Sequence, residues 1–369
     1  MERAGSVPLF IYYCCQNPDP FENVVFQDLL DQVHRWSEFY FRGSGAYSMF
    51  KATCAPLLRV LDFYYVGGMA DAIDFPFVSC PSLIHLNWPW LESLPTENSV
   101  IPWMKLQRLR TWYIQPEIVS KYVVQAKSLL HFHCMGGHLQ GPFPAPGSLT
   151  HPNLQSLVIP CSYLVWLVLP QLSHLLVTGH TDELPHFLLR SNCRLQSLAF
   201  NSYEVRTDCL SSILHSPSST SLTELCLPVG TTVWFTTELL TDLTYTSHSS
   251  EVLCPNLKIL HLSRARGASG QLGPMVFSRF THPQSHLEQF EYYDFSLERP
   301  ERSILIDGGF DEFDRHTIFA IPNVHVQCSN TWISITRDRI GTGSLRFMDK
   351  EPRSHTFSLD EFWREHHAI

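Results

Sequence analysis

Histidine and cysteine side chains gather in one short segment that offers the clearest candidate for metal chemistry. The residues are His131, His133, Cys134 and His138. A structural zinc site needs four nitrogen or sulfur ligands in a tetrahedral array. In a strand, side chains alternate between two faces, so His131 and His133 would point one way and Cys134 the other. We therefore expect no metal ion here.

Motifs that support catalysis are absent or incomplete. Gly341 and Gly343 lack the third glycine of a dinucleotide-binding loop, so they indicate a turn. No Gly-x-Ser-x-Gly nucleophile elbow occurs. Acidic residues beside Gly308 and Gly309 lack the spacing of a calcium-binding EF-hand, so we expect a solvated loop at Asp307, Asp311, Glu312 and Asp314. We expect no catalytic residue and no cofactor, and we predict that the chain is not an enzyme. An enzyme with an unrecognised site is the alternative.

The elements that must position any site are indicated by a repeated phrase, Leu-x-x-Leu-x-apolar. Its second and third apolar positions are two residues apart, so they share one face of a strand and can stack on the next copy. The average spacing is about 25 residues, which is typical of leucine-rich repeats. We therefore predict an α/β fold, a leucine-rich-repeat solenoid with a parallel concave sheet and irregular helices or loops on its convex side. The phrases begin at Leu58, Leu83, Leu106, Leu129, Leu154, Leu172, Leu195, Leu222, Leu257 and Leu287.

Parallel strands need crossover segments between them, and the intervals hold candidate helices for this purpose. These helices are expected at residues 184–190, 207–215, 236–243 and 272–279. We divide the chain into a degenerate N-terminal cap at 1–50, repeats at 51–295, and a C-terminal cap and polar tail at 296–369. The N-terminal cap is expected to hold a strand at 9–14, a helix at 21–33 and a strand at 37–41. The tail is expected to end in a helix at 360–365.

Composition and charge exclude several classes of partner. The chain of 369 residues has a net charge of -9, whereas nucleic-acid binding needs a basic stripe. Residues 157–177 are numerous enough to cross a bilayer, but they include two prolines and a histidine, so we expect a buried core segment and no membrane partner. The eleven cysteines cannot all pair and suggest a reducing compartment, cytoplasmic or nuclear. Cys14 and Cys15 are expected to be buried strand residues.

Several ordered phrases resemble one large family, the F-box/leucine-rich-repeat proteins of mushroom-forming fungi. They are "ERAGSVPLFIYY" at 2–13, "HRWSEFYF" at 34–41, "IPWMKLQRL" at 101–109, "LPHFLLRSNCRLQSLAF" at 184–200, "LTELCL" at 222–227, "LCPNLKILHL" at 253–262 and "MVFSRF" at 275–280. The resemblance covers roughly residues 1–295. It implies a repeat domain that holds the substrate of a cullin ubiquitin ligase.

The F-box of that family lies upstream of the "ERAGSVPL" phrase and docks to a Skp-type adaptor. Here Met1 stands immediately before the phrase, and the sequence contains no F-box. Adaptor docking is therefore expected only if an F-box exists upstream. Two hypotheses follow: a free-standing recognition module, or a truncated paralogue without function.

Strand alternation also predicts a binding surface. If the second and third apolar positions face the core, the residues two and four positions after the first leucine face the concave side. Arginine and aromatic residues are favoured where interfaces carry most binding energy. Imidazoles with a pKa of about 6.5 would make such binding pH-sensitive. We expect an unidentified protein to bind at His85, Asn87, Arg108, Arg110, Trp112, His131, His133 and His174.

Overall fold

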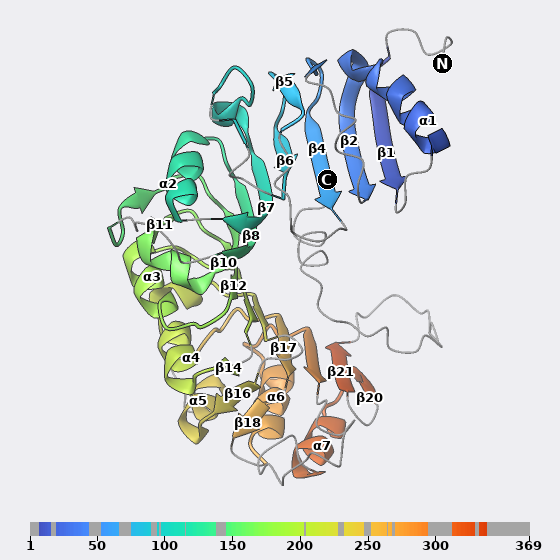
Figure 1. Ribbon diagram of the computed structural model, residues 1–369. Helices are drawn as coiled ribbons and strands as arrows, with labels where there is room; N and C mark the ends of the chain where they lie inside the picture. Colours follow the sequence, from blue (N-terminus) through green and yellow to red (C-terminus); the bar gives the residue numbers. More distant parts are fainter. Residues whose placement is uncertain are drawn as a thin grey trace, which may run out of the picture. The chain divides into compact units, whose positions relative to one another are not determined.

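The computed structural model divides into two compact units, Met1–Leu172 (unit 1) and Ser173–Ile369 (unit 2). Figure 1 labels the helices and strands of both units. The boundaries predicted from the sequence, at residues 50/51 and 295/296, separate regular repeats from the two terminal caps. They differ in kind from the division into units, and they stay predictions. The structure describes residues 7–15, 20–43, 53–65, 75–89, 94–95, 97–114, 116–137, 145–202, 204–227, 232–246, 252–263, 265–267, 270–293, 312–328 and 332–337.

Unit 1 contains a parallel sheet. Its strands follow the order β1 (Leu9–Cys15), β2 (Trp36–Gly43), β4 (Val60–Tyr65), β6 (His85–Asn87), β7 (Arg108–Ile114), β8 (His131–Gly137) and β10 (Ser156–Pro160). The connections include helices α1 (Pro20–Leu30) and α2 (Pro116–Gln125), and the 3-10 helices η2 (Val33–Arg35), η5 (Trp103–Lys105) and η6 (Cys161–Trp166). Two small sheets pair β3 (Thr53–Cys54) with β5 (Phe77–Ser79), and β9 (Leu149–Thr150) with β11 (Leu167–Val168).

Unit 2 continues the same strand-and-helix alternation. Its main-sheet strands follow the order β12 (His174–Thr178), β13 (Ser197–Asn201), β15 (Glu224–Cys226), β17 (Ile259–Ser263), β19 (Gln289–Tyr293), β21 (Trp332–Arg337) and β20 (Val324–Cys328). The pairs from β12 to β19 are parallel, whereas β21 pairs antiparallel with both β19 and β20. A small parallel sheet joins β14 (Glu204–Val205), β16 (Thr232–Phe235) and β18 (Ala265–Gly267).

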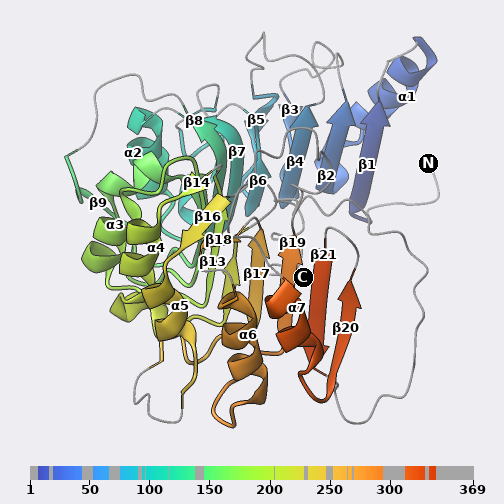
Figure 2. The ribbon, with the colours of Figure 1, turned by 90° about the horizontal axis from the view of Figure 1, so that it is seen from below.

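Helices of unit 2 occupy the intervals between strands. They are α3 (Leu184–Ser191), α4 (Thr207–Leu214), α5 (Thr237–Leu243), α6 (Leu272–Thr281) and α7 (Glu312–Phe319), with the 3-10 helix η7 (Pro217–Ser219). Figure 1 and Figure 2 show α3, α4 and α5 following one another along the same side of the strands. The four helices predicted in this region are confirmed as α3 to α6, and the predicted strand, helix and strand at the N-terminus are confirmed as β1, α1 and β2.

The repeated phrase explains where the strands begin and where the core lies. In each of the ten phrases a strand starts two residues after the first leucine. The three apolar positions of every phrase are at most 3% exposed, which confirms that they face the core. The described chain is thus a mixed α/β fold with a mostly parallel sheet.

Stacking between neighbouring segments of the sheet is visible in the aromatic core of unit 1. Phe63 lies between the ring of Phe41 on β2 and that of Trp88, directly after β6. Its ring centroid is 4.5 Å from that of Phe41, with the planes 8° apart, and 4.8 Å from that of Trp88. All three side chains are buried. Equivalent core positions of successive strands are therefore in direct contact, as parallel pairing requires.

A buried cation holds part of unit 2 together. Arg279 of α6 is completely buried and donates hydrogen bonds to three backbone carbonyls, those of Leu243, Leu253 and Cys254. Its guanidinium also lies 5.4 Å from the ring centroid of Tyr245. The guanidinium links the end of α5 to the segment before β17, and its burial needs these acceptors because an unsatisfied buried charge is costly.

Two expectations for polar residues are wrong. Asp314 was expected in a solvated loop, but it lies in α7, is 1% exposed and accepts a hydrogen bond of 2.7 Å from the backbone N–H of Gly273 at the start of α6. Cys14 was expected to be buried and is exposed. Residues 307–311, Gly341, Gly343 and the 360–365 segment lie outside the described residues.

The apolar run at 157–177 does not form one long helix. It contains most of β10, the 3-10 helix η6, β11 and the first part of β12. No helix in the described part of the chain combines the length and the apolar character needed to cross a membrane. None of the nine cysteines whose side chains are described forms a disulfide bond.

Candidate functional site

Sheet register brings six of the predicted residues together on three neighbouring strands of unit 1. Across β6, β7 and β8, His85 pairs with Arg108, which pairs with His131. Two residues further along the strands, Asn87, Arg110 and His133 form a second row. Neighbouring strands are about 4.8 Å apart. We call these six residues the polar ribbon.

The two rows of the polar ribbon differ in exposure. His85, Arg108 and His131 of the first row are half-buried, as is Arg110 of the second. Asn87 is only 7% exposed and His133 is 0% exposed. Both side chains are therefore largely shielded in the structure, and the expectation that they contact a partner stays a prediction. Alternation fixes the direction of a side chain, whereas its exposure depends on everything packed around it.

Two further predicted residues lie beside or apart from the polar ribbon. Trp112 follows Arg110 on the same face of β7, is half-buried and packs edge-on against Tyr64, with 5.1 Å between ring centroids. His174 lies on β12 in unit 2, where its Nδ1 is 2.8 Å from the Ser173 hydroxyl. Because it belongs to the other unit, His174 is not included in the polar ribbon.

Sequence reasoning missed the polar contacts that flank the ribbon on β2 and β4. Asn87 donates a 2.6 Å hydrogen bond to the Asp62 carboxylate, and the Tyr40 hydroxyl donates a 2.8 Å hydrogen bond to Glu38. Burial and the Glu38 carboxylate raise the pKa of Tyr40 to about 12. Glu38 and Tyr40 were overlooked because β2 carries Trp36 and Phe39 at the two positions where most later phrases carry leucine.

An exposed arginine also lies on this flank. The Arg42 guanidinium is 5.8 Å from the ring centroid of Tyr12 and 5.7 Å from that of Tyr64. Arginine over an aromatic face is a favourable arrangement at surfaces. Tyr12 of β1 and Tyr64 of β4 thus extend the aromatic margin that Trp112 begins.

His85 and His133 of the polar ribbon are neutral at physiological pH. Burial, followed by the nearby charges of Arg108 and Arg59, lowers the pKa of His85 to about 4. Burial and Arg110 hold the pKa of His133 well below its ordinary value of 6.5. The expected pH sensitivity near neutrality is therefore not supported for these two residues.

Acid should destabilise the protein through His85, because its pKa is about 4 in the folded state and about 6.5 in the unfolded state. Between those values the unfolded chain binds more protons, so the free energy of unfolding falls as the pH drops from about 6.5 to about 4. We expect the unfolding temperature of His85→Gln to fall less between pH 7 and pH 4.5 than that of the unaltered protein. An equal fall in both would contradict the prediction.

No protein-family model and no curated protein matches the sequence.

The metal-like cluster of the sequence does not assemble in the described residues. Cys134 occupies a core position on the opposite face of β8 from His131 and His133, and its thiol donates a 2.9 Å hydrogen bond to the Gly136 carbonyl. Burial raises the pKa of this thiol, which makes it a poor ligand. His138 lies outside the described residues. Where the structure describes the chain, no group of three histidine, cysteine or acidic side chains could hold a metal.

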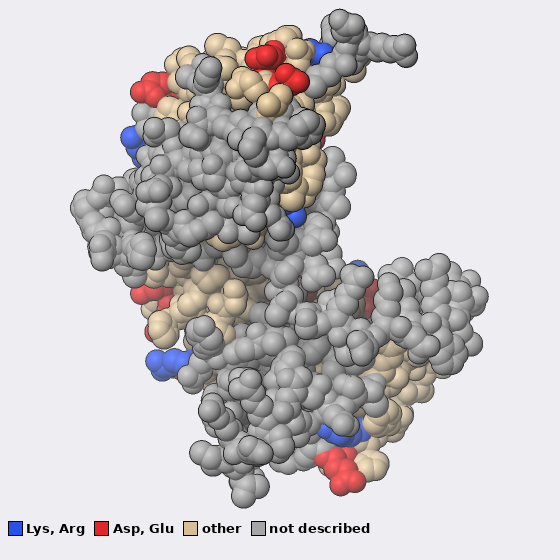
Figure 3. Space-filling model, turned by 45° about the vertical axis from the view of Figure 1, so that its right-hand side comes forward, with Lys and Arg blue, Asp and Glu red and all other residues tan. Residues whose placement is uncertain are grey.

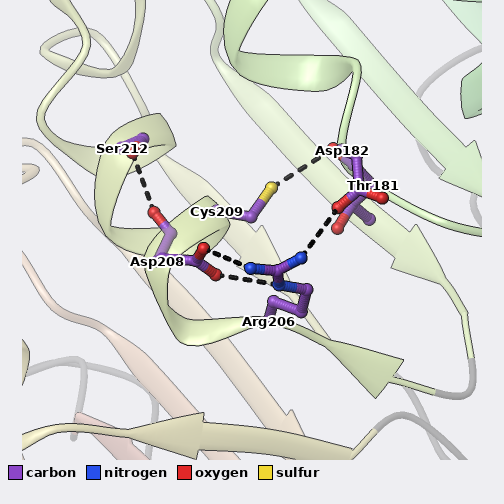
Figure 4. A network of polar contacts seen from close by, with 6 residues as sticks. All are labelled: Thr181, Asp182, Arg206, Asp208, Cys209 and Ser212. Carbon is purple, nitrogen blue, oxygen red and sulfur yellow. Dashed lines mark hydrogen bonds and ion pairs between the residues drawn. The ribbon is translucent and has the colours of Figure 1, made fainter.

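Charged residues elsewhere form small local groups. In the view of Figure 3, the described lysine, arginine and acidic side chains are scattered over the surface. A polar network, drawn in Figure 4, lies at the start of α4, where Arg206 contacts both oxygens of Asp208 at 3.2 and 2.7 Å and lies 3.9 Å from Asp182. The Cys209 thiol donates to the Thr181 carbonyl at 3.2 Å. This network links α4 to the segment before α3, a structural role.

Proposed function

We propose that the chain is a non-enzymatic leucine-rich-repeat recognition module that binds a protein partner through unit 1. The contact residues are the accessible members of the polar ribbon, His85, Arg108, Arg110 and His131, with Trp112 at its edge. The observation that supports this function is the register of β6, β7 and β8, which aligns these side chains on adjacent strands. Arginine and tryptophan are the residue types that most often dominate binding energy at protein interfaces.

The surrounding structure supports recognition in a further respect. The contact residues project from strands, and the phrase positions beneath them are buried, so the surface is rigid before binding. A rigid surface loses little conformational entropy when it binds. The module would resemble the substrate-holding part of an F-box receptor in a cytoplasmic or nuclear protein, and adaptor binding is not included in the proposal.

The proposal can be tested with a photo-crosslinking amino acid at His131 in cells of the source organism. Crosslinked proteins would be quantified by mass spectrometry for the otherwise unaltered chain and for R108Q/R110Q. Loss of hot-spot arginines weakens binding by about 2 kcal/mol or more, so we expect the principal crosslinked protein to fall at least tenfold. The matched control R194Q/R315Q removes the same charge from exposed positions of unit 2 and should leave the yield unchanged. An equal yield from R108Q/R110Q would overturn the proposed function.

A further inference from the structure

Arg108 occupies the centre of the first row of the polar ribbon, between His85 and His131. Its guanidinium is half-buried, and burial lowers its pKa, although an arginine keeps its charge at neutral pH. Among the described residues, no carboxylate forms an ion pair with Arg108. A half-buried cation without an internal counter-charge is suited to a charge supplied by a partner.

The carboxylates on the same face of unit 1 are already engaged. Glu38 accepts from the Tyr40 hydroxyl, and Asp62 accepts from the Asn87 amide. Both acidic residues lie on β2 and β4, whereas β6, β7 and β8 present only arginine, histidine and asparagine at the ribbon positions. This side of the face therefore offers donors to a ligand and has no acidic side chain of its own at those positions.

One neighbouring group extends the set of donors. The neutral His85 ring carries one N–H, and His85 pairs in register with Arg108. A planar guanidinium forms two parallel hydrogen bonds with a carboxylate, a geometry that lysine cannot provide. The donor set thus favours an anion that is small and planar.

We propose that Arg108 binds a carboxylate of an acidic segment in the protein partner, with His85 donating to a neighbouring oxygen of that segment. This inference rests on the proposed function and adds the chemical class of the partner. A protein segment is favoured over a nucleic acid because the chain carries a net charge of -9, which disfavours a polyanion. Aspartate or glutamate at one position of the segment would accept the two parallel hydrogen bonds of the Arg108 guanidinium.

The test uses the full chain and a library of random, C-terminally amidated peptides displayed for selection. Bound peptides would be sequenced, and the best one would be compared by fluorescence anisotropy with its counterpart carrying Gln or Asn for each Glu or Asp. We expect acidic residues to be enriched and the acidic peptide to bind at least tenfold more tightly than its amide counterpart, as charged hydrogen bonds imply. R108Q should abolish this difference, and R194Q should preserve it.

The possible outcomes bear differently on the proposed function and on the carboxylate inference. Selected peptides without acidic residues, whose binding R110Q or H131Q still abolishes, would leave the proposed function standing and overturn the carboxylate inference. A preference for phosphoserine over glutamate at the selected position would also overturn it. Absence of any ribbon-dependent peptide would overturn both. If R108Q fails to fold, R108K keeps the charge and loses the two-pronged geometry, so its acidic preference should fall at least threefold.

Discussion

Replacing Arg279 with alanine is expected to lower the free energy of unfolding of unit 2 by about 3–5 kcal/mol. The side chain is completely buried and satisfies three backbone carbonyls. Alanine would leave these acceptors unpaired and create a cavity beside Tyr245. Amide hydrogen exchange in α6 and β17 measures the effect locally, because exchange reports the stability of the surrounding cooperative unit.

Two companion variants make the Arg279 experiment specific. Arg279→Lys keeps the charge but cannot reach all three carbonyls with one ammonium group, so its loss should be intermediate. Arg194→Ala, at an exposed position of the same unit, should change the stability by no more than about 0.5 kcal/mol. If the amides of α6 exchange equally slowly in the Arg279→Ala and Arg194→Ala variants, the Arg279 guanidinium contributes nothing to stability.

Replacing Phe63 with alanine is expected to destabilise unit 1 by about 3–5 kcal/mol. The ring contacts Phe41 on β2 and Trp88 directly after β6, so its removal leaves a cavity and breaks two aromatic pairs. Hydrogen exchange of amides in β2, β4 and β6 would measure the loss. The core of unit 1 would then be shown to depend on aromatic contacts between successive segments of the sheet.

The control for Phe63 is a leucine at the same position. Phe63→Leu fills more of the space than alanine and should cost less, about 1–1.5 kcal/mol. Faster exchange confined to β4, with β2 and β6 unaffected, would show that stacking does not couple the strands. Equal protection in Phe63→Ala and the unaltered chain would show that the site repacks without loss.

The starts of the ten phrase strands and the faces of their side chains were predictable from the repeated phrase. Strand periodicity is local, so residues two apart share a face whatever surrounds them. The buried third positions Thr111 and Cys134 show this well, because the phrase places even a polar residue in the core. Helices α3 to α6 were predictable for a related reason, since parallel strands need crossovers.

The sequence by itself also determined which residues share the polar ribbon, because one position rule applied to three successive phrases selects them. Only the tertiary structure decided which of them a partner could reach. His133 and Asn87 satisfy the same rule as Arg110, yet they are buried. Exposure, the low pKa of His85 and the burial of Asp314 against Gly273 all depend on groups distant in the sequence. Such long-range packing leaves no periodic signal, and this is the physical reason that the site was only partly predictable.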